Sequence, residues 1–381
     1  MARVRMGMVG GGEGAFIGAV HRIAAAIDGE IELVCGAFSS DAERSARSGA
    51  ALYLPQNRVY ADYQAMLTAE AALPAAQRMQ FVAIATPNHL HFPIAQAALR
   101  AGFHVLSDKP ATFDLQEALR LRDLLDETGL LYGLAHTYTG YPLVKEARAR
   151  VAAGELGRVR KVVVEYSQGW LAGRAAADDN KQAAWRLDPQ QAGVSCCMGD
   201  IGVHAANLAE YICGLRITEL CADLTAFVEG RALDDDGSVL LRFESGARGV
   251  LHASQICVGE ENALKIRVYG DQGGLEWEQQ APNTLWLKWP DRPTQILRTG
   301  GGYLGDMAAI NTRTPMGHPE GYLEGFANIY SEFADTLQSL IEGSSADAAV
   351  DFPTVEDGVR GVEFIEAAVA SSQAGAKWVK L

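Results

Sequence analysis

Short apolar runs alternate with amphipathic stretches through the first third of the chain. The apolar runs have the length of buried strands and are bounded by turn residues; they cover residues 4–9, 31–38, 80–85, 103–106 and 130–135. Between them, apolar positions recur at helical spacing over residues 21–27, 60–72, 90–101 and 112–128. Strands that alternate with helices predict a doubly wound α/β domain built on a parallel sheet.

The pattern changes after His136. Strand-like segments are then joined by turn signals such as Asp236-Gly237 and Gly273-Gly274, which favours an antiparallel sheet. The predicted strands cover residues 159–170, 220–229, 238–243, 247–257, 263–269, 274–277 and 284–289, and the predicted helices cover 143–153, 322–342 and 354–374. We therefore expect two domains, residues 1–136 and residues 137–381, the second an α/β domain.

Composition narrows the class of protein. With 381 residues, 48% hydrophobic and 21% charged, the chain is long enough for two globular domains. A formal net charge of -14 argues against a nucleic-acid partner, because phosphates require basic surface. No secretory signal and no window of about 20 apolar residues is evident, and the six cysteines lack zinc spacing. We expect a cytoplasmic protein with reduced thiols and no membrane contact.

A glycine-rich stretch, Met8–His21, follows the first predicted strand and opens a helix. We expect positive φ at Gly10 and Gly12, which lets the backbone approach a pyrophosphate, and close helix packing at Gly18. The helix N-terminus adds free N–H groups. The loop is about three residues longer than the usual G-x-G-x-x-G, which predicts a longer lid over the pyrophosphate. The expected cofactor-binding residues here are Gly10, Gly12, Glu13, Gly14, Ala15, Phe16 and Ile17.

Cofactor preference depends on the end of the second strand. Ser39 and Ser40 stand where NAD-specific folds usually place a carboxylate, and Asp41 fits the N-cap of the next helix. Hydroxyls and Arg44 suit a 2′-phosphate, yet serine also hydrogen-bonds a free ribose. NAD and NADP therefore both remain open.

Two further strand ends carry polar side chains where doubly wound sheets bind ligands. The first is T-P-N-H-L-H, with Thr86, Pro87, Asn88 and His91 as expected cofactor contacts. His89 and His91 lack a third ligand, so no metal is expected. The second is S-D-K-P, with Asp108 and Lys109 at the position expected for a nicotinamide ring.

The second domain contains G-V-S-C-C-M-G-D-I-G-V-H, which becomes helical from Asp200. Asp200 and His204 are then i and i+4 on one face, and a carboxylate beside an imidazole raises its basicity. Alternatively, Asp200 is a helix cap and His204 a buried histidine satisfied by it. Together with Lys109 and the glycine stretch, the pair supplies the base, the cation and the cofactor site that hydride transfer from a carbinol needs.

Aromatic and polar residues outside the nucleotide domain suit a polyhydroxylated ring, although each taken singly also fits a core or interface position. The expected substrate-binding residues are Lys109, Tyr138, Gln168, Trp170, Arg186, Asp200, His204 and His318.

The chain resembles the Gfo/Idh/MocA oxidoreductase family over nearly its whole length. Four motifs carry the resemblance: the glycine loop that ends in G-A-V-H, then T-P-N-H-L-H, D-K-P and G-D-I-G-V-H. The resemblance implies a Rossmann domain followed by an open, mainly antiparallel α/β domain that builds a homodimer or homotetramer through its sheet. It also implies that Lys109, Asp200 and His204 are catalytic: His204 takes the hydroxyl proton, Lys109 hydrogen-bonds the same oxygen, and Asp200 tunes the pair. Asn88 and His91 would lie along the cofactor.

The predicted function is an NAD(P)-dependent dehydrogenase acting on a secondary hydroxyl of a sugar, glycoside or cyclitol. Two alternatives remain. One is an NAD-dependent enzyme that cleaves glycosides by transient oxidation and elimination, which would act without added cofactor. The other is a non-catalytic dinucleotide-binding regulator, which would turn over no polyol.

Overall fold

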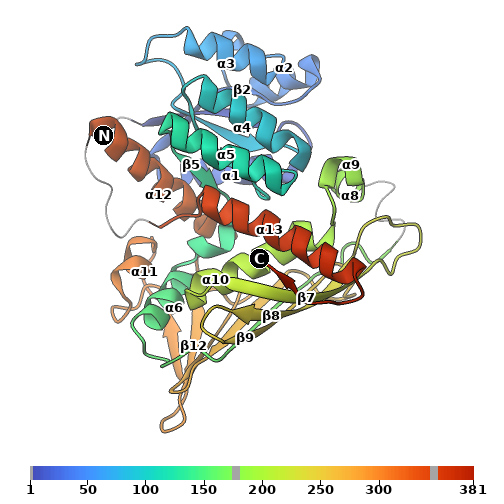
Figure 1. The fold of residues 1–381 in the computed structure, drawn as a ribbon. Coiled ribbons are helices and arrows are strands. Elements are labelled where there is room, and N and C mark those ends of the chain that lie inside the picture. The colour runs from blue at the N-terminus through green and yellow to red at the C-terminus, as the bar shows by residue number, and fades with distance from the viewer. Residues whose placement is uncertain (1–2, 174–180, 344–350) are drawn as a thin grey trace. The chain divides into compact units, whose positions relative to one another are not determined.

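The computed structural model describes residues 3–173, 181–343 and 351–381, and its chain forms two compact units (Figure 1). The first unit comprises the chain up to Thr137 together with Tyr322–Val359. The second comprises Tyr138–Gly321 and Arg360–Leu381.

The first unit is built on a five-stranded parallel sheet with the order β2-β1-β3-β4-β5. Its strands are β1 (Val4–Gly10), β2 (Ile31–Ala37), β3 (Phe81–Ala85), β4 (His104–Ser107) and β5 (Tyr132–Leu134). Its helices are α1 (Phe16–Ile27), α2 (Ala42–Ala51), α3 (Tyr63–Ala71), α4 (His91–Arg100), α5 (Leu115–Thr128) and α12 (Tyr322–Glu342), with short 3-10 turns at Gln56–Arg58 and Asn88–Leu90. The predicted Rossmann-type sheet is confirmed.

Helices cover both faces of this sheet. Successive residues of β3 point to opposite faces: Val82 and Ile84 pack in the cluster that includes residues of α3, α4 and α5, whereas Phe81 and Ala83 pack with α1 and α12. Burial on both sides explains why the strands are continuous apolar runs.

Local chemistry sets the helix ends. The carboxylates of Asp41, Asp62 and Asp114 accept the N-terminal backbone N–H groups of α2, α3 and α5. Gly129 ends α5 in the left-handed conformation at φ +64°, as predicted.

The C-terminal part of the chain returns to the first unit. α12 packs along α1, and Phe326, Tyr330 and Phe333 join the core beneath the parallel sheet. The expected division into residues 1–136 and 137–381 therefore places α12 in the wrong unit. The sequence pattern of an amphipathic helix predicts an apolar face, but it does not predict which sheet covers that face.

The second unit is built on a nine-stranded sheet with the order β13-β12-β11-β10-β6-β9-β8-β7-β14, antiparallel except for the parallel pair β6 and β9. Its strands are β6 (Lys161–Ser167), β7 (Ile217–Thr225), β8 (Asp236–Phe243), β9 (Arg248–Ser254), β10 (Ala263–Tyr269), β11 (Gly274–Glu278), β12 (Thr284–Lys288), β13 (Gln295–Arg298) and β14 (Val379–Lys380). The mainly antiparallel sheet was predicted; β13 and β14 were not.

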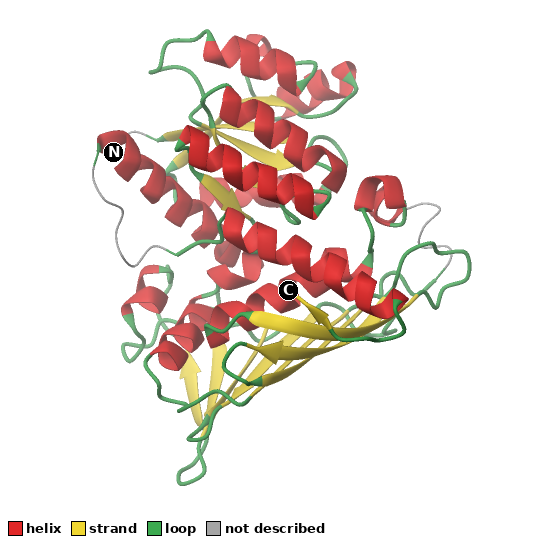
Figure 2. Cartoon of the chain, viewed as in Figure 1, coloured by secondary structure: helices red, strands yellow, loops and turns green. Residues whose placement is uncertain are grey.

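The helices of the second unit are α6 (Pro142–Ala152), α8 (Lys181–Arg186), α9 (Pro189–Ala192), a π turn (Met198–Gly202), α10 (Val203–Cys213), α11 (Asp306–Ile310) and α13 (Val355–Gln373), which begins in the first unit. A 3-10 turn, Thr137–Gly140, joins the two units along the chain. α6, α10 and α13 lie over one face of the sheet (Figure 2). Strands such as β10 alternate buried and half-buried residues accordingly. No helix among the described residues has the length and apolarity needed to cross a membrane.

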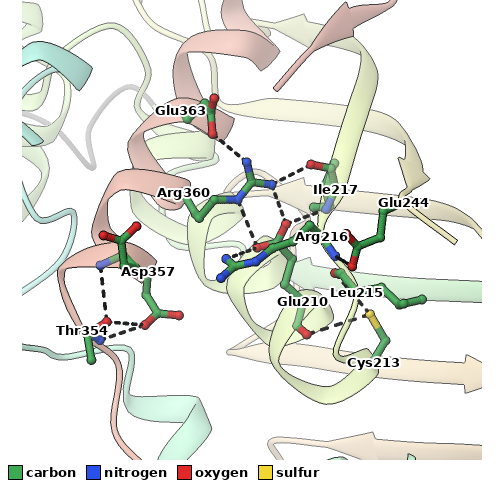
Figure 3. A network of polar contacts seen from close by, with 11 residues as sticks. Glu210, Cys213, Leu215, Arg216, Ile217, Glu244, Thr354, Asp357, Arg360 and Glu363 are labelled. Carbon is green, nitrogen blue, oxygen red and sulfur yellow. Dashed lines mark hydrogen bonds and ion pairs between the residues drawn. The ribbon is translucent and has the colours of Figure 1, made fainter. Parts of the chain in front are cut away.

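A polar network fixes the C-terminal end of α10 (Figure 3). Glu210 Oε1 accepts hydrogen bonds of 2.6 Å from the Ile217 backbone N–H and from Arg360 Nη2. Arg360 also donates to the Ile217 carbonyl at 2.6 Å. The helix that carries His204 is thereby tied to both β7 and α13.

Candidate active site

The glycine loop of the first unit requires residues without a side chain. Gly10 has φ +81°, and a Cβ there would lie 2.3 Å from the Ala85 carbonyl oxygen. The second positive φ is at Gly11, not at Gly12 as predicted. Gly12 is needed for a different reason, because a Cβ would lie 2.7 Å from the Phe38 carbonyl oxygen. Gly18 packs against Gly11, so the predicted close approach is confirmed.

Glu13, the first of the three extra loop residues, is held against α2. The Glu13 backbone N–H donates to Ser48 Oγ at 3.0 Å, and its carboxylate lies 3.4 Å from Arg47 Nε. On the other side, Arg22 Nη1 donates to the Gly11 carbonyl at 2.6 Å. A hollow of about 550 Å³ is bordered by residues 12–16 of this loop and by the facing parts of α1 and α2. Whether the longer loop covers a pyrophosphate stays a prediction.

The N-terminus of α1 is open for an anion. α1 begins at Phe16 after Ala15, whose side chain has no group that could cap the helix. The first backbone N–H groups of the helix are therefore oriented as in a phosphate-binding helix terminus. Those of Phe16 and Ile17 are among the groups predicted to face the cofactor.

The end of β2 agrees with the predicted cap. Asp41 accepts the Arg44 backbone N–H at 2.9 Å, and that hydrogen bond lowers the pKa of the Asp41 carboxyl. Ser39 Oγ accepts the Asp41 backbone N–H at 3.1 Å, while Ser40 is exposed. The Asp41 carboxylate is thus engaged by α2, which leaves NAD and NADP both possible.

His91 connects two loops at the edge of the sheet. Its ring is 1% exposed; Nδ1 lies 2.6 Å from the Pro110 carbonyl oxygen and Nε2 lies 2.9 Å from the Thr86 carbonyl oxygen. Burial lowers the pKa of His91. Both ring nitrogens face backbone, so His91 is suited to hold the loops in place. A direct contact between His91 and a cofactor stays a prediction.

The same edge offers polar atoms to a ligand. Thr86 Oγ1 is buried and has no hydrogen-bond partner among the described residues, and Asn88, which follows Pro87, is 5% exposed. A buried polar atom without a partner is costly unless a ligand or water satisfies it. Together with the close approach of backbone that the missing side chain of Gly10 permits, this fits a dinucleotide.

Lys109 lies two residues after the end of β4 and is held by its neighbour Asp108. The Lys109 backbone N–H donates to Asp108 Oδ1 at 2.8 Å, and Asp108 Oδ2 lies 3.9 Å from His21 Nε2. Burial tends to raise the pKa of Asp108, but His21 and the charge of Lys109 outweigh it and the pKa is lowered. His136, which the sequence did not single out, is 1% exposed; burial first, and then Lys109, lower its pKa to about 3.

In the second unit, Asp200 lies in the π turn and His204 in the first turn of α10. The predicted helix is confirmed, except that it starts with i to i+5 bonding, a feature frequent at functional sites. Asp200 Oδ2 accepts a hydrogen bond of 2.8 Å from Gln255 Nε2 and lies 3.0 Å from Arg186 Nε. One hydrogen bond and one ion pair therefore hold this carboxylate.

Aromatic rings surround His204. The rings of His204 and Tyr138 meet edge to face at 5.0 Å between centroids, and Tyr166 lies at 6.5 Å. The hydroxyls of Tyr138 and Tyr166 are hydrogen-bonded to each other. Tyr166 OH and Gln168 Nε2 both donate to Asn262 Oδ1 at 2.7 Å. This arrangement orients the hydroxyls and amides beside the imidazole.

A cation lies on tryptophan rings at the other side of Asp200. The Arg186 guanidinium is 4.3 Å from the Trp185 centroid and 5.9 Å from that of Trp170. Trp170 Nε1 in turn donates to Gln168 Oε1 at 2.8 Å. Stacking on aromatic faces favours the planar guanidinium of arginine.

The structure links six predicted substrate-binding residues in this unit, namely Tyr138, Gln168, Trp170, Arg186, Asp200 and His204. His318 is not joined to them by the contacts described: it lies on an exposed turn, with Nδ1 3.2 Å from the Pro315 carbonyl oxygen. Its role in substrate binding stays a prediction.

Sequence reasoning missed Gln255 and Asn262. Both lie at the ends of sheet strands, Gln255 just after β9 and Asn262 just before β10. Knowing that β6 lies between β9 and β10 would have brought these ends together, but that order has no local signal. Among the described residues, no group of three or more His, Cys, Asp or Glu side chains is arranged to hold a metal ion.

Both parts of the chain match known families. Residues 4–136 match the oxidoreductase family with an NAD-binding Rossmann fold. Residues 144–276 match the GFO/IDH/MocA C-terminal domain.

Relatives match over most or all of the length. The uncharacterized oxidoreductase YfiI of Bacillus subtilis is 34% identical over 99% of this chain and 96% of its own. An inositol dehydrogenase homologue from Azotobacter vinelandii, solved with NAD+, is 37% identical with a TM-score of 0.95 and coverage of 100% and 98%; with NADH and myo-inositol, its TM-score is 0.93 at 36% identity. Levoglucosan dehydrogenase of Pseudarthrobacter phenanthrenivorans is 26% identical over 78% of this chain and 79% of its own. The chain belongs to the Gfo/Idh/MocA family of NAD(P)-dependent oxidoreductases.

Proposed function

We propose that the protein is a dehydrogenase that transfers hydride between a secondary hydroxyl of a sugar, glycoside or cyclitol and the nicotinamide of NAD or NADP. The observation that carries the proposal is the position of Asp200 and His204 within one network of aromatic and hydrogen-bonding side chains. A bound nicotinamide supplies the hydride acceptor. The remaining tasks fall to residues of the chain.

His204 is the proposed general base. Its ring packs edge-on against Tyr138, which restricts its rotation, and it accepts the proton of the substrate hydroxyl as hydride leaves the carbon. Lys109 is proposed to donate a hydrogen bond to the same oxygen and to stabilise its negative character. Asp200 keeps a negative charge in this network, which favours the protonated imidazole.

An uncharged ring suits the network better than a phosphorylated sugar. Arg186 is the cation on the tryptophan faces, and Asp200 lies 3.0 Å from it, so the pair is neutral together. Aromatic faces and amide groups bind a polyol by stacking and hydrogen bonds. The myo-inositol in the structure of the Azotobacter homologue supports this choice.

A screen of sugars, cyclitols and glycosides with NAD and NADP in parallel tests the proposal. We expect reduced nicotinamide to accumulate with an uncharged polyol and much less with its phosphate ester. Cleavage of a glycoside without added cofactor would instead support the eliminating mechanism. Cofactor binding without turnover of any polyol would indicate a regulator.

Two variants test the proposed roles. Lys109→Ala and His204→Ala should each lower kcat by about 10²–10⁴-fold, because each removes a group that acts on the transferred proton or the oxygen. Cofactor affinity, measured by fluorescence titration, should stay within a few-fold of the wild type for His204→Ala. Full activity in both variants would contradict the assignment.

We also propose that the sheet of the second unit forms a homodimer or homotetramer. Leu240 and Ile296, 49% exposed each, are apolar side chains of its strands that the unit leaves uncovered. Light scattering after size exclusion should give a mass of two or four chains, and Leu240→Glu should lower it. A monomer at micromolar concentration would rule the interface out.

A further inference from the structure

Asp234 holds the segment that leads into the π turn. It is 9% exposed and lies just before β8. Its Oδ1 accepts the Cys196 backbone N–H at 3.0 Å, and its Oδ2 accepts the Met198 backbone N–H and Ser195 Oγ, both at 3.0 Å. The Asp234 carbonyl accepts the Cys197 backbone N–H at 3.1 Å. One residue thus binds four consecutive positions of the chain.

These contacts continue directly to Asp200. The backbone N–H of Cys196 binds Asp234, and the carbonyl of the same residue accepts a hydrogen bond of 2.8 Å from the Asp200 backbone N–H. Ser195 Oγ, which donates to Asp234, accepts the Gly199 backbone N–H at 3.1 Å. The unpaired N–H groups at the start of a helix are satisfied here by one buried carboxylate and one hydroxyl. Displacement of Asp234 would therefore be transmitted to Asp200 through two short paths.

The opposite end of α10 is anchored separately by Glu210 and Arg360 (Figure 3). α10 is 11 residues long, about 16 Å at the usual rise per residue. Asp234 is at the end where Asp200 and His204 lie, so it is the anchor that sets their position.

We propose that Asp234 is a positioning residue for hydride transfer, acting through the Ser195–Met198 segment on Asp200 and His204. The proposal rests on the proposed function, because it assigns Asp234 a task in that reaction. Burial raises the pKa of Asp234 against the lowering effect of its three hydrogen bonds. The geometry, in which four consecutive residues bind Asp234, carries the proposal.

Asp234→Asn is the informative variant. Asn has nearly the same size as Asp, but its NH₂ group can only donate hydrogen bonds. Whichever carboxylate oxygen it replaces, it faces a group that donates to Asp234 in the wild type: the Cys196 N–H on one side, or the Met198 N–H and the Ser195 hydroxyl on the other. We expect kcat to fall about ten- to hundredfold, as for a small misplacement of reacting groups. KM for the cofactor should stay within about twofold, because the glycine loop belongs to the first unit.

Glu320→Gln is the matched control. Glu320 is 5% exposed, and its Oε1 accepts two backbone N–H groups, Arg313 at 2.6 Å and Thr314 at 2.7 Å, together with Thr314 Oγ1 at 3.1 Å. The control disrupts the same kind of buried carboxylate in a different segment. If both variants lose comparable thermal stability but only Asp234→Asn loses kcat, the effect is positional. An equal loss of kcat in both would overturn the proposal.

Amide hydrogen exchange gives a readout that does not depend on turnover. Asp234→Asn should accelerate exchange at Gly199–His204, whereas Glu320→Gln should not. Unchanged exchange there overturns the proposal even if activity falls. Failure of the wild type to oxidise any polyol would refute the proposed function alone. If Asp234→Asn does not fold, Ser195→Ala is the second variant, because it removes one partner of the carboxylate. It should show the same pattern with a smaller change. A Ser195→Ala variant with the kcat and the hydrogen exchange of the wild type would overturn the proposal.

Discussion

The side-chain amide of Gln255 donates a 2.8 Å hydrogen bond to Oδ2 of Asp200, from a position that is 0% exposed. Gln255 Oε1 in turn faces Cys196 Sγ at 3.4 Å. The amide is therefore held on both sides, and it fixes the carboxylate that lies one helical turn before His204.

Gln255→Leu should lower kcat about ten- to hundredfold. A hydrogen bond to a charged group contributes about 1.5–3 kcal/mol, and Leu leaves one carboxylate oxygen with one donor fewer. Steady-state kinetics with a polyol substrate measure the change. Gln295→Leu is the control. Gln295 is an exposed residue of β13, and its side chain accepts a hydrogen bond from Trp289 Nε1. Equal kcat in Gln255→Leu and wild type would show that Arg186 alone holds Asp200.

Gly10→Ala should weaken cofactor binding far more than Gly102→Ala. Both glycines have nearly the same φ, +81° and +83°, so both substitutions cost about 1 kcal/mol of backbone strain. Only at Gly10 does the new Cβ meet a backbone atom, the Ala85 carbonyl oxygen at 2.3 Å; at Gly102 nothing lies within 4 Å. Titration of both variants with NAD measures the difference. Matching affinities would mean that the loop relaxes to accept a side chain.

Tyr166→Phe should raise KM for the polyol about three- to tenfold with a smaller effect on kcat. Its hydroxyl bonds to Tyr138 OH and donates to Asn262 Oδ1 at 2.7 Å, so its loss leaves both neighbours with a broken hydrogen bond worth about 0.5–1.5 kcal/mol. Tyr269→Phe, on the neighbouring strand β10, is the control. An unchanged KM would remove the Tyr138–Tyr166 pair from the substrate-binding surface.

His136 should make the fold sensitive to acid. Burial and the charge of Lys109 lower its pKa to about 3 in the folded protein, whereas an unfolded histidine titrates near 6.5. Between these values the unfolded chain binds a proton that the folded chain excludes, so this contribution to stability is present above about pH 6.5 and is lost as pH falls.

Urea unfolding of wild type and His136→Gln near pH 7.5 and near pH 5 measures this effect. The wild type should lose about 2 kcal/mol more than the variant between the two pH values, at about 1.4 kcal/mol for each pH unit below 6.5. His91 and the carboxylates are common to both proteins and cancel in the comparison. Identical losses would show that His136 is protonated at no cost in the folded state.

Local chemistry made much of the fold predictable. The predicted limits of α12 and β10 agree with the structure, because each follows a regular apolar period. The Asp41 cap and the Gly129 helix end were also predicted, since both depend on side-chain or backbone chemistry within a few residues. Features of this kind need no knowledge of the rest of the molecule.

Long-range contacts were not predictable in the same way. Gln255 and Asp234 reach the Asp200 segment only through the order of strands in the nine-stranded sheet. The motif T-P-N-H-L-H singled out His91 as a cofactor contact, but no local pattern indicated that its ring nitrogens lie against the Pro110 and Thr86 carbonyl oxygens. A motif identifies a residue that matters and leaves its partner unspecified.

The return of α12 to the first unit has a consequence for synthesis. Phe326, Tyr330 and Phe333 pack with Phe81 in the core of a sheet whose strands are complete by Leu134. A chain growing from the ribosome therefore exposes that apolar face until α12, about 190 residues after the last strand of the sheet, has been made. The parallel sheet is thus translated well before the helix that completes its core, and a fragment that ends after β5 lacks the side chains that cover this face.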